Sequence, residues 1–417
     1  MSTEEKPAKP QNSTVRVLKV QNYRLTWPAM FASAMGRMMW TFVSGYLIFQ
    51  LTKSSLLTQM VAVAFSAPQF LLGVFSGTLA DAYDRRKVMF WSLLLMSIAT
   101  FITAILAFLG MATAWNILAF SAVFGVLFTL NNVTRRTFTF DVVGRDLLPS
   151  AMAMDNIGMT MGNILGPMIG GLLLDLAPGN PMRGAAWTFL AIGAAYAAAT
   201  VLLFYVKPDW KQSKIPLSVG SALGNTTEGL KVVATSKVLI GILGVTVLFN
   251  LVYPPSRSLI PAFQPVLNIT ATQLGILGAA SGIGALVGAT YLTTRGTIKR
   301  QSLYYWTGSA LSCGLLAVFA STDNYGVALV SLVVGGIGQA WFGTMQATLV
   351  MLSVPDNMRG RVMGILSMAI GIQTLGSLVM GILAEALGPG PALLAMAVAG
   401  TISTFIWVSI FKEMRKV

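Results

Sequence analysis

The residues of this chain that could do chemistry in an apolar environment begin with one arginine. Arg37 lies about half-way along an apolar run, among Met35, Met38, Met39 and Trp40. A charged side chain at the centre of a membrane helix costs about 2.5 to 3.5 kcal/mol even on lenient insertion scales, so it usually faces a water-filled cavity. We predict that Arg37 holds an anionic or phenolate group of a solute, or pairs with a coupling carboxylate. The alternative is a structural arginine bonded to helix carbonyls.

Asp155 is the acidic residue that the sequence predicts inside an apolar run. It stands at the head of Gly158, Gly162 and Gly166, which share one face of a helix because side chains three or four residues apart lie above one another. A carboxyl group in such a place is suited to carrying a proton through a membrane protein. The alternative is an acid in the first turn of a helix, stabilised by the helix dipole.

Other polar side chains in apolar runs are candidates for contact with a solute. Arg257 follows Tyr253-Pro-Pro at the end of a run, where it is either a second cationic contact, a gate or a surface residue. Each amide in such a run either lines a cavity or bonds between helices, which stabilises by about 0.6 kcal/mol on average. The candidate amides are Asn131, Asn132, Asn163, Asn250, Gln339, Gln346 and Gln373. Of these we select Asn131, Asn250 and Gln346, with Arg37 and Arg257, as predicted substrate contacts.

The composition excludes several kinds of catalytic site. The chain has no His and a single Cys, Cys313, so the usual zinc and iron clusters and an internal disulfide are excluded. No Ser or Cys has the partners that nucleophilic catalysis needs, and no Gly-Lys dipeptide occurs, which excludes a phosphate-binding P-loop. We therefore expect no enzyme activity, no cofactor and no metal. An ion gradient remains as the energy source, since one charge crossing about 100 mV supplies roughly 2.3 kcal/mol.

The elements that must position these residues are long apolar helices. Hydrophobic residues make up 55% of the 417 residues, charged residues only 10%, and the mean hydropathy is +0.72. Helices are expected because a membrane-spanning segment must satisfy its own backbone hydrogen bonds. Measured against the roughly 20 residues that cross a bilayer, the charge-free runs predict an all-α membrane protein with twelve transmembrane helices. They start near Leu25, Leu56, Val88, Trp115, Ala151, Trp187, Val238, Thr272, Ser302, Tyr325, Val362 and Pro391.

The basic residues predict the orientation of these helices. All Lys and Arg residues except Arg37, Lys53, Arg183 and Arg257 lie in the two tails or in every second connection. Retained Lys and Arg mark the cytoplasmic side, so both termini are predicted to be cytoplasmic. The bias also accounts for the net charge of +14 without nucleic acid as a partner, because anionic lipid headgroups suffice.

A weak internal repeat divides the chain into two halves. The longest polar connection carries five lysines between Lys207 and Lys237, and an offset of about 210 residues brings Gly166 onto Gly376 and Asp175 onto Glu385. Two pseudo-symmetric six-helix bundles are a transporter architecture, with the substrate site between them. The predicted division is a tail 1–24, a bundle 25–206, a linker 207–237, a bundle 238–411 and a tail 412–417.

One cytoplasmic turn combines glycine, acids and bases. The stretch runs from Gly77 to Lys87, and its key residues are Gly77, Asp81, Asp84, Arg85 and Arg86. A carboxylate here can cap a neighbouring helix and pair with arginine, contacts that must break when two halves rock. The alternative is that the bases only anchor the topology. The stretch resembles the signature of the major facilitator superfamily, although Ala82 and Asp84 replace a basic residue and a glycine that are common there.

A second motif lies in the fifth predicted span. Small residues repeat four apart, which lets another backbone approach closely, and a proline adds a bend. The residues are Gly158, Gly162, Gly166, Pro167, Gly170 and Gly171. Ordinary helix packing is the alternative. The run resembles the antiporter motif of the same superfamily, and that resemblance implies outward transport.

The resemblance covers nearly the whole chain and implies a monomeric secondary transporter of a bacterial inner membrane. The ending Asp84-Arg85-Arg86 of the cytoplasmic turn resembles the branch that includes enterobactin exporters and macrolide efflux proteins. We therefore expect a proton antiporter that exports a small organic molecule, siderophore-like or otherwise anionic and amphiphilic, with protons and membrane lipids as its other partners. The alternatives are a multidrug or macrolide efflux pump, a lysophospholipid flippase, a nutrient symporter, and a channel or receptor.

Overall fold

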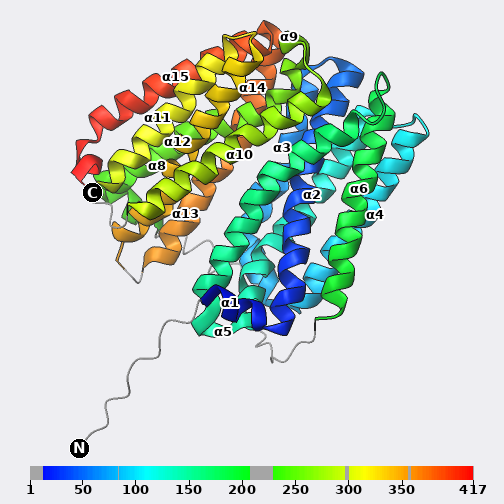
Figure 1. Cartoon of the computed structure of the whole chain (residues 1–417). Coiled ribbons are helices and arrows are strands. Elements are labelled where there is room, and N and C mark those ends of the chain that lie inside the picture. Colours follow the sequence, from blue (N-terminus) through cyan, green and yellow to red (C-terminus); the bar gives the residue numbers. More distant parts are fainter. Residues whose placement is uncertain (1–12, 83, 207–228, 296–299, 356–357, 417) are drawn as a thin grey trace, which may run out of the picture.

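The computed structural model describes residues 13–82, 84–206, 229–295, 300–355 and 358–416, and these ranges contain helices and no strand. The helices form two bundles that lie side by side (Figure 1). The first bundle consists of α1 (Ser13–Lys19), α2 (Gln21–Thr52), α3 (Ser55–Ala82), α4 (Arg85–Phe108), α5 (Ala114–Leu174) and α6 (Pro181–Phe204).

The second bundle follows residues 207–228, which lie outside the described ranges. It consists of α8 (Lys237–Leu259), η1 (Ile260–Phe263), α9 (Gln264–Leu267), α10 (Ala271–Thr294), α11 (Gln301–Ala320), α12 (Tyr325–Leu352), α13 (Arg359–Gly371), α14 (Gln373–Leu387), α15 (Pro389–Ile410) and η3 (Lys412–Lys416).

The helix α5 crosses the bundle twice. Its backbone leaves helical geometry at Gly144, with φ 71° and ψ 176°, and folds back there. Glycine adopts this conformation without the steric cost that other residues incur. The sequence predicted a connection before a fifth span starting at Ala151, whereas the helix continues to Val143 and resumes at Arg145. Helix therefore replaces the expected loop.

The described helices supply twelve crossings, as the sequence predicted. Nine helices in the described ranges are long and apolar enough to span a membrane, and they include α5 with its two arms and α13–α14 as one span from Arg359 to Leu387. The helices α2 and α3, of 32 and 28 residues, lie in the same bundle and complete the set. Each contains a proline, Pro28 and Pro68.

The two bundles meet at one end and diverge toward the other (Figure 1). At the end where they meet, α5 packs against α10 and α14 packs against α3. A Cβ atom on Gly171 would lie 3.0 Å from the Cα of Gly275, and one on Gly381 would lie 3.0 Å from Leu56. The small residues therefore allow the closest approach of the two bundles. We call this the closed end, and the opposite end, where α1 lies, the open end.

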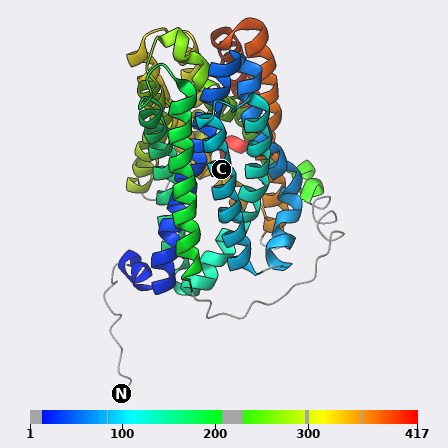
Figure 2. The ribbon, with the colours of Figure 1, turned by 90° about the vertical axis from the view of Figure 1, so that its right-hand side faces the viewer.

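The short helix α1 lies within the segment predicted to be a polar tail. Val17 is fully buried and packs with Tyr23, Val143 and Ala151 in a small cluster separate from the main core. Figure 2 shows α1, in dark blue, at the same end of the bundle as the elbow of α5. Val17 and the partly buried Val20 therefore dock this segment on the elbow, whereas Leu18 is exposed.

Candidate functional site

A cavity of about 410 Å³ lies between the two bundles. Its walls come from α2, α3 and α5 on one side and from α8, α10, α12 and α14 on the other. Among the described residues that line it there are two arginines and no acidic side chain. The polar lining includes Arg37, Thr41, Ser66, Gln69, Asn132, Arg257, Ser258, Gln339, Gln373 and Ser377.

Arg37 lies at this cavity, as the sequence predicted for a membrane arginine. Its guanidinium carbon is 5.0 Å from the centre of the Phe128 ring, a cation–π contact. The Nε atom is buried and has no hydrogen-bond partner among the described residues. The Nε atom therefore makes no bond to a helix carbonyl, in contrast to the alternative of a structural arginine that is fully bonded to such carbonyls.

Arg257 lines the cavity from the opposite bundle. It follows Pro254 and Pro255 in α8, which lines the same wall through Tyr253 and Pro254. A solute in the cavity therefore meets one arginine from each bundle. Since the described lining holds no carboxylate, these two charges set the sign of the local potential.

The remaining lining is apolar and aromatic. Phe65 and Phe128 stand with ring centres 5.4 Å apart, and Tyr253 donates from its hydroxyl to Gln339 at 3.2 Å. Met38 and Met159 add flexible thioethers to the same wall. The cavity therefore combines an apolar surface with a small number of polar groups, the usual character of a small-molecule site.

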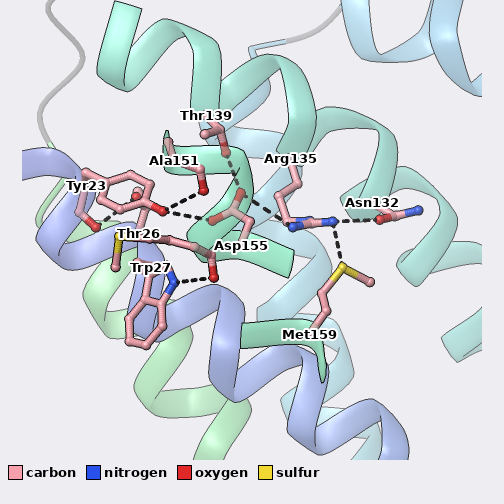
Figure 3. A network of polar contacts seen from close by, with 10 residues as sticks. Tyr23, Thr26, Trp27, Asn132, Arg135, Thr139, Ala151, Asp155 and Met159 are labelled. Carbon is pink, nitrogen blue, oxygen red and sulfur yellow. Dashed lines mark hydrogen bonds and ion pairs between the residues drawn. The ribbon is translucent and has the colours of Figure 1, made fainter. Parts of the chain in front are cut away.

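Asp155 is buried within the first bundle, where three side chains surround its carboxylate (Figure 3). Tyr23 donates to Oδ1 at 3.1 Å and Thr139 donates to Oδ2 at 3.1 Å. The guanidinium of Arg135 lies 3.6 Å from Oδ2. The carboxylate of Asp155 therefore makes two hydrogen bonds and one ion pair inside the bundle.

Arg135 is the functional candidate that sequence reasoning missed. It is one of the basic residues whose distribution predicts the orientation, and by sequence alone it is explained as a topology anchor at the end of the fourth predicted span, but the structure buries it to 9% exposure. One guanidinium nitrogen also contacts Asn132 at 3.3 Å and the sulfur of Met159 at 3.2 Å (Figure 3). A signal was present in the spacing, because Arg135 stands one helical turn after Asn132 and so continues its face.

The predicted amide contacts separate into two groups. Asn131 is 5% exposed and lies in a small pocket of the first bundle beside Arg37. Asn250 and Gln346 lie inside the second bundle, where Asn250 donates to the carbonyl of Thr246 at 2.9 Å and Gln346 donates to the Thr246 hydroxyl at 3.1 Å. Neither of them lines the cavity. The amides that do line it are Asn132, Gln339 and Gln373, which were among the candidates, and Gln69, which was not.

The described contacts of the cytoplasmic turn from Gly77 to Lys87 lie within the first bundle. Asp84 caps α4 by accepting from the amides of Arg86 at 3.0 Å and Lys87 at 3.3 Å. Arg85 forms an ion pair of 2.7 Å with Asp141 of α5. Arg86 donates to carbonyls at the end of α6. The two other residues predicted here, Gly77 and Asp81, belong to α3, and their side chains lie outside the described part of the structure.

The glycine run of α5 packs against two different helices. At Gly158, Gly162 and Gly166 it faces α2 of its own bundle, and a Cβ atom on Gly166 would lie 2.7 Å from the Cβ of Met38. A Cβ atom on Gly170 would lie 3.2 Å from the Phe42 ring. Further along, the run crosses to α10 of the opposite bundle.

At that crossing the two helix backbones touch. A Cβ atom on Gly171 would lie 2.5 Å from the carbonyl oxygen of Ala271, and one on Gly275 would lie 2.4 Å from that of Pro167. The run therefore joins the two bundles beside the cavity that Pro167 lines.

Polar contacts fasten the closed end. The side chain of Gln50 donates to that of Gln264 across the bundles at 2.6 Å. Ser54 at the start of α3 donates to the Glu385 carboxylate of α14 at 3.0 Å. Asp175, at the end of α5, accepts from the first amides of α10. Both acids lie where the bundles meet.

Comparison with known proteins agrees with this architecture. A family model described as "transmembrane secretion effector" matches residues 12–416 of this chain. The enterobactin exporter EntS of Shigella flexneri is 27% identical over 314 residues, which are 72% of this chain and 71% of the relative. EntS of Salmonella typhimurium is 28% identical over 319 residues, 72% of each protein.

Among solved structures, the nucleoside transporter NupG superposes with a TM-score of 0.72 and 15% identity, covering 93% of this chain and all of that one. This likeness shows the major facilitator fold and nothing about cargo. With a family model that spans almost the whole sequence, the chain belongs to the transmembrane secretion effector family of the major facilitator superfamily, and is therefore a multi-pass membrane transporter of a small-molecule substrate and not an enzyme.

Proposed function

We propose that this protein exports a small anionic, amphiphilic organic molecule from the cytoplasm in exchange for protons. One observation carries the proposal: the cavity between the bundles is lined by an arginine from each bundle and, in its described lining, by no acid. Burying these charges beside apolar walls is costly unless a counter-charge is supplied. An anionic cargo with an apolar body supplies it.

The relatives support export of such a cargo. Both are named as enterobactin exporters, so a siderophore-like molecule is the preferred candidate for this chain as well. The cavity volume of about 410 Å³ is sufficient for a small organic molecule. The glycine run of α5, which resembles the antiporter motif, supports the outward direction.

The distribution of basic residues supports an open end that faces the cytoplasm. The helix α1 carries Arg16 and Lys19, and the elbow beside it carries Arg145. Retained positive charge marks the cytoplasmic side, and the membrane would be a bacterial inner membrane, with both termini inside. In this orientation the cavity receives cargo from the cytoplasm while the far side is shut.

Alternating access requires the closed end to separate and the open end to close. The bundles are in contact through small residues and through a few polar side chains at the closed end, so a rigid-body rotation breaks few strong interactions. One chain supplies both bundles and the cavity, which supports a monomer as the working unit.

Asp155 is the proposed proton carrier. It is a buried acid of the first bundle, and it shares a small pocket with Arg37, so its charge is felt at the cargo site. Protonation would cancel its pairing with Arg135 and release that guanidinium. Proton and cargo thus act on neighbouring arginines.

The cavity argues against one of the alternative transport classes, and experiments separate the others. A pump for cationic drugs needs a carboxylate in its cavity, and none occurs in the described lining. A lysophospholipid flippase would be revealed by competition with lysophospholipid. Saturable counterflow in proteoliposomes would exclude a channel or a receptor.

The test uses the cargo found by comparing metabolites that accumulate in cells with and without the gene. Its uptake into inside-out vesicles is then measured with an imposed pH gradient. Arg37→Ala should abolish uptake and Arg37→Lys should keep part of it, whereas Arg183→Ala, which removes a charge outside the cavity lining, is the matched control. Full uptake by Arg37→Ala would refute the proposed role.

A further inference from the structure

A second, smaller pocket opens beside the central cavity within the first bundle. It encloses about 20 Å³ and shares the lining residues Arg37, Phe128, Asn132 and Met159 with the cavity. About 10–15 Å³ of such space holds one water molecule. The pocket therefore admits one or two atoms and excludes the body of any organic cargo. We call it the side pocket.

Two residues that line the side pocket each carry a hydrogen-bond donor without a partner. The Nδ2 atom of Asn131 and the Nε atom of Arg37 are both buried, and neither donates to any of the described residues. Asn131 is only 5% exposed. A buried donor without an acceptor bears the full cost of its desolvation, and the cost is larger for a charged group. An acceptor atom in the pocket would remove it.

The carboxylate of the side pocket is already engaged. Its one carboxylate among the described residues is that of Asp155, which already accepts from Tyr23 and Thr139 and pairs with Arg135. The charged residues of the lining are two arginines and this aspartate. With Asp155 ionised, the pocket keeps one uncompensated positive charge.

The geometry points to an anion subsite: the side pocket binds a single acceptor-only group between Arg37 and Asn131. This group is a carboxylate or phenolate oxygen of the cargo, or a small inorganic anion such as chloride. An anion satisfies both unpartnered donors and the residual charge at once, whereas a water molecule leaves the charge in place. The cargo source rests on the proposed function, and binding of an inorganic anion does not.

A cargo oxygen in the side pocket would leave the rest of the molecule in the main cavity. Phe128 and Met159 line both spaces, so an aromatic ring or an alkyl chain attached to that oxygen would pack on them. Arg257, which lines only the main cavity, would remain for a second negative group.

The test measures chloride binding to the full-length protein in nanodiscs, in gluconate buffer, through the broadening of the chloride NMR line. The wild type should broaden the line, and acetate should reverse the broadening by competition. Asn131→Leu, which removes one donor at nearly constant volume, should weaken the affinity about tenfold or more. Thr100→Val is the control, because it removes a buried hydroxyl of the same bundle that bonds within its own helix.

Equal broadening by wild type and Asn131→Leu, or none by the wild type, would overturn the subsite and leave water as its occupant. If Asn131→Leu does not fold, Asn131→Asp serves, since its carboxylate supplies an internal anion and should also abolish the broadening. Transport assays separate the two sources of the anion. Chloride should slow cargo uptake if the cargo occupies the subsite. Chloride should be required for cargo uptake if chloride itself occupies the subsite. A failed transport assay with intact chloride binding would refute the proposed function alone.

Discussion

The carboxylate of Asp175 accepts a hydrogen bond of 2.8 Å from the backbone amide of Thr272, across the two bundles. The amide belongs to the first turn of α10, where the helix dipole favours a negative charge. Glu385 repeats the arrangement by accepting from the amide of Leu56, in the first turn of α3, at 3.0 Å. Each bundle therefore ends a helix with an acid that caps a helix of the other.

These two carboxylates are expected to hold the closed end together. Asp175→Asn and Glu385→Gln each remove a charge–dipole interaction of about 0.3 to 1 kcal/mol, and the double variant should populate the state that is open at this end. Spin labels at Lys53→Cys and Thr270→Cys would report it as longer distances. The native Cys313 is buried, so labelling is specific.

The control for this prediction is Glu413→Gln, which removes an acid that pairs with Lys237 at 3.9 Å on an exposed surface. It should leave the distances unchanged. Unchanged distances in the double variant as well would mean that packing alone keeps this end shut.

Close approach of α5 and α10 predicts that a single methyl group is not tolerated there. Gly171→Ala places a Cβ atom 2.5 Å from a backbone oxygen, so the two helices must separate. We expect normal insertion but a marked loss of transport, measured as cargo uptake per inserted protein. Gly314→Ala is the matched control, because no atom lies within 4 Å of its Cβ position. Wild-type turnover by Gly171→Ala would show that the contact is ordinary packing.

Proton coupling predicts a specific phenotype for Asp155→Asn. The amide keeps the volume of the side chain but cannot exchange a proton, so cargo exchange should persist while its dependence on the pH gradient disappears. Vesicle uptake with and without an imposed gradient measures both. Asp323→Asn, at an exposed position, should behave as the wild type. Coupling that survives Asp155→Asn would rule out this carboxylate as the carrier.

The ion pair between Arg85 and Asp141 is expected to stabilise the first bundle. Its atoms are 2.7 Å apart and both side chains are largely buried, at 17% and 12% exposure. A double-mutant cycle with Arg85→Met and Asp141→Asn should give a coupling energy of about 0.5 to 3 kcal/mol in thermal unfolding. Additive effects of the two substitutions would indicate that the pair contributes nothing beyond its separate charges.

Hydropathy predicted the crossings correctly, because the length of an apolar run is a local property of the sequence. An apolar run of sufficient length must be a helix in a membrane, and an arginine within it must find water or a partner. The same logic predicted that the glycine run of α5 would accept another backbone. It did not predict which backbone: the run faces α2 from Gly158 to Gly170, and it meets α10 at Pro167 and Gly171.

Only the tertiary structure decided which polar residues meet. Arg135 reads as a topology anchor in the sequence, but α5 folds back at Gly144 and brings it to Asp155. Asn250, like Asn131, is an amide within an apolar run of the sequence. It nevertheless bonds within the second bundle, away from the cavity. The sequence determines what each residue can do, whereas the packing of the helices decides which of these groups share a space, since that depends on contacts between residues far apart in the chain.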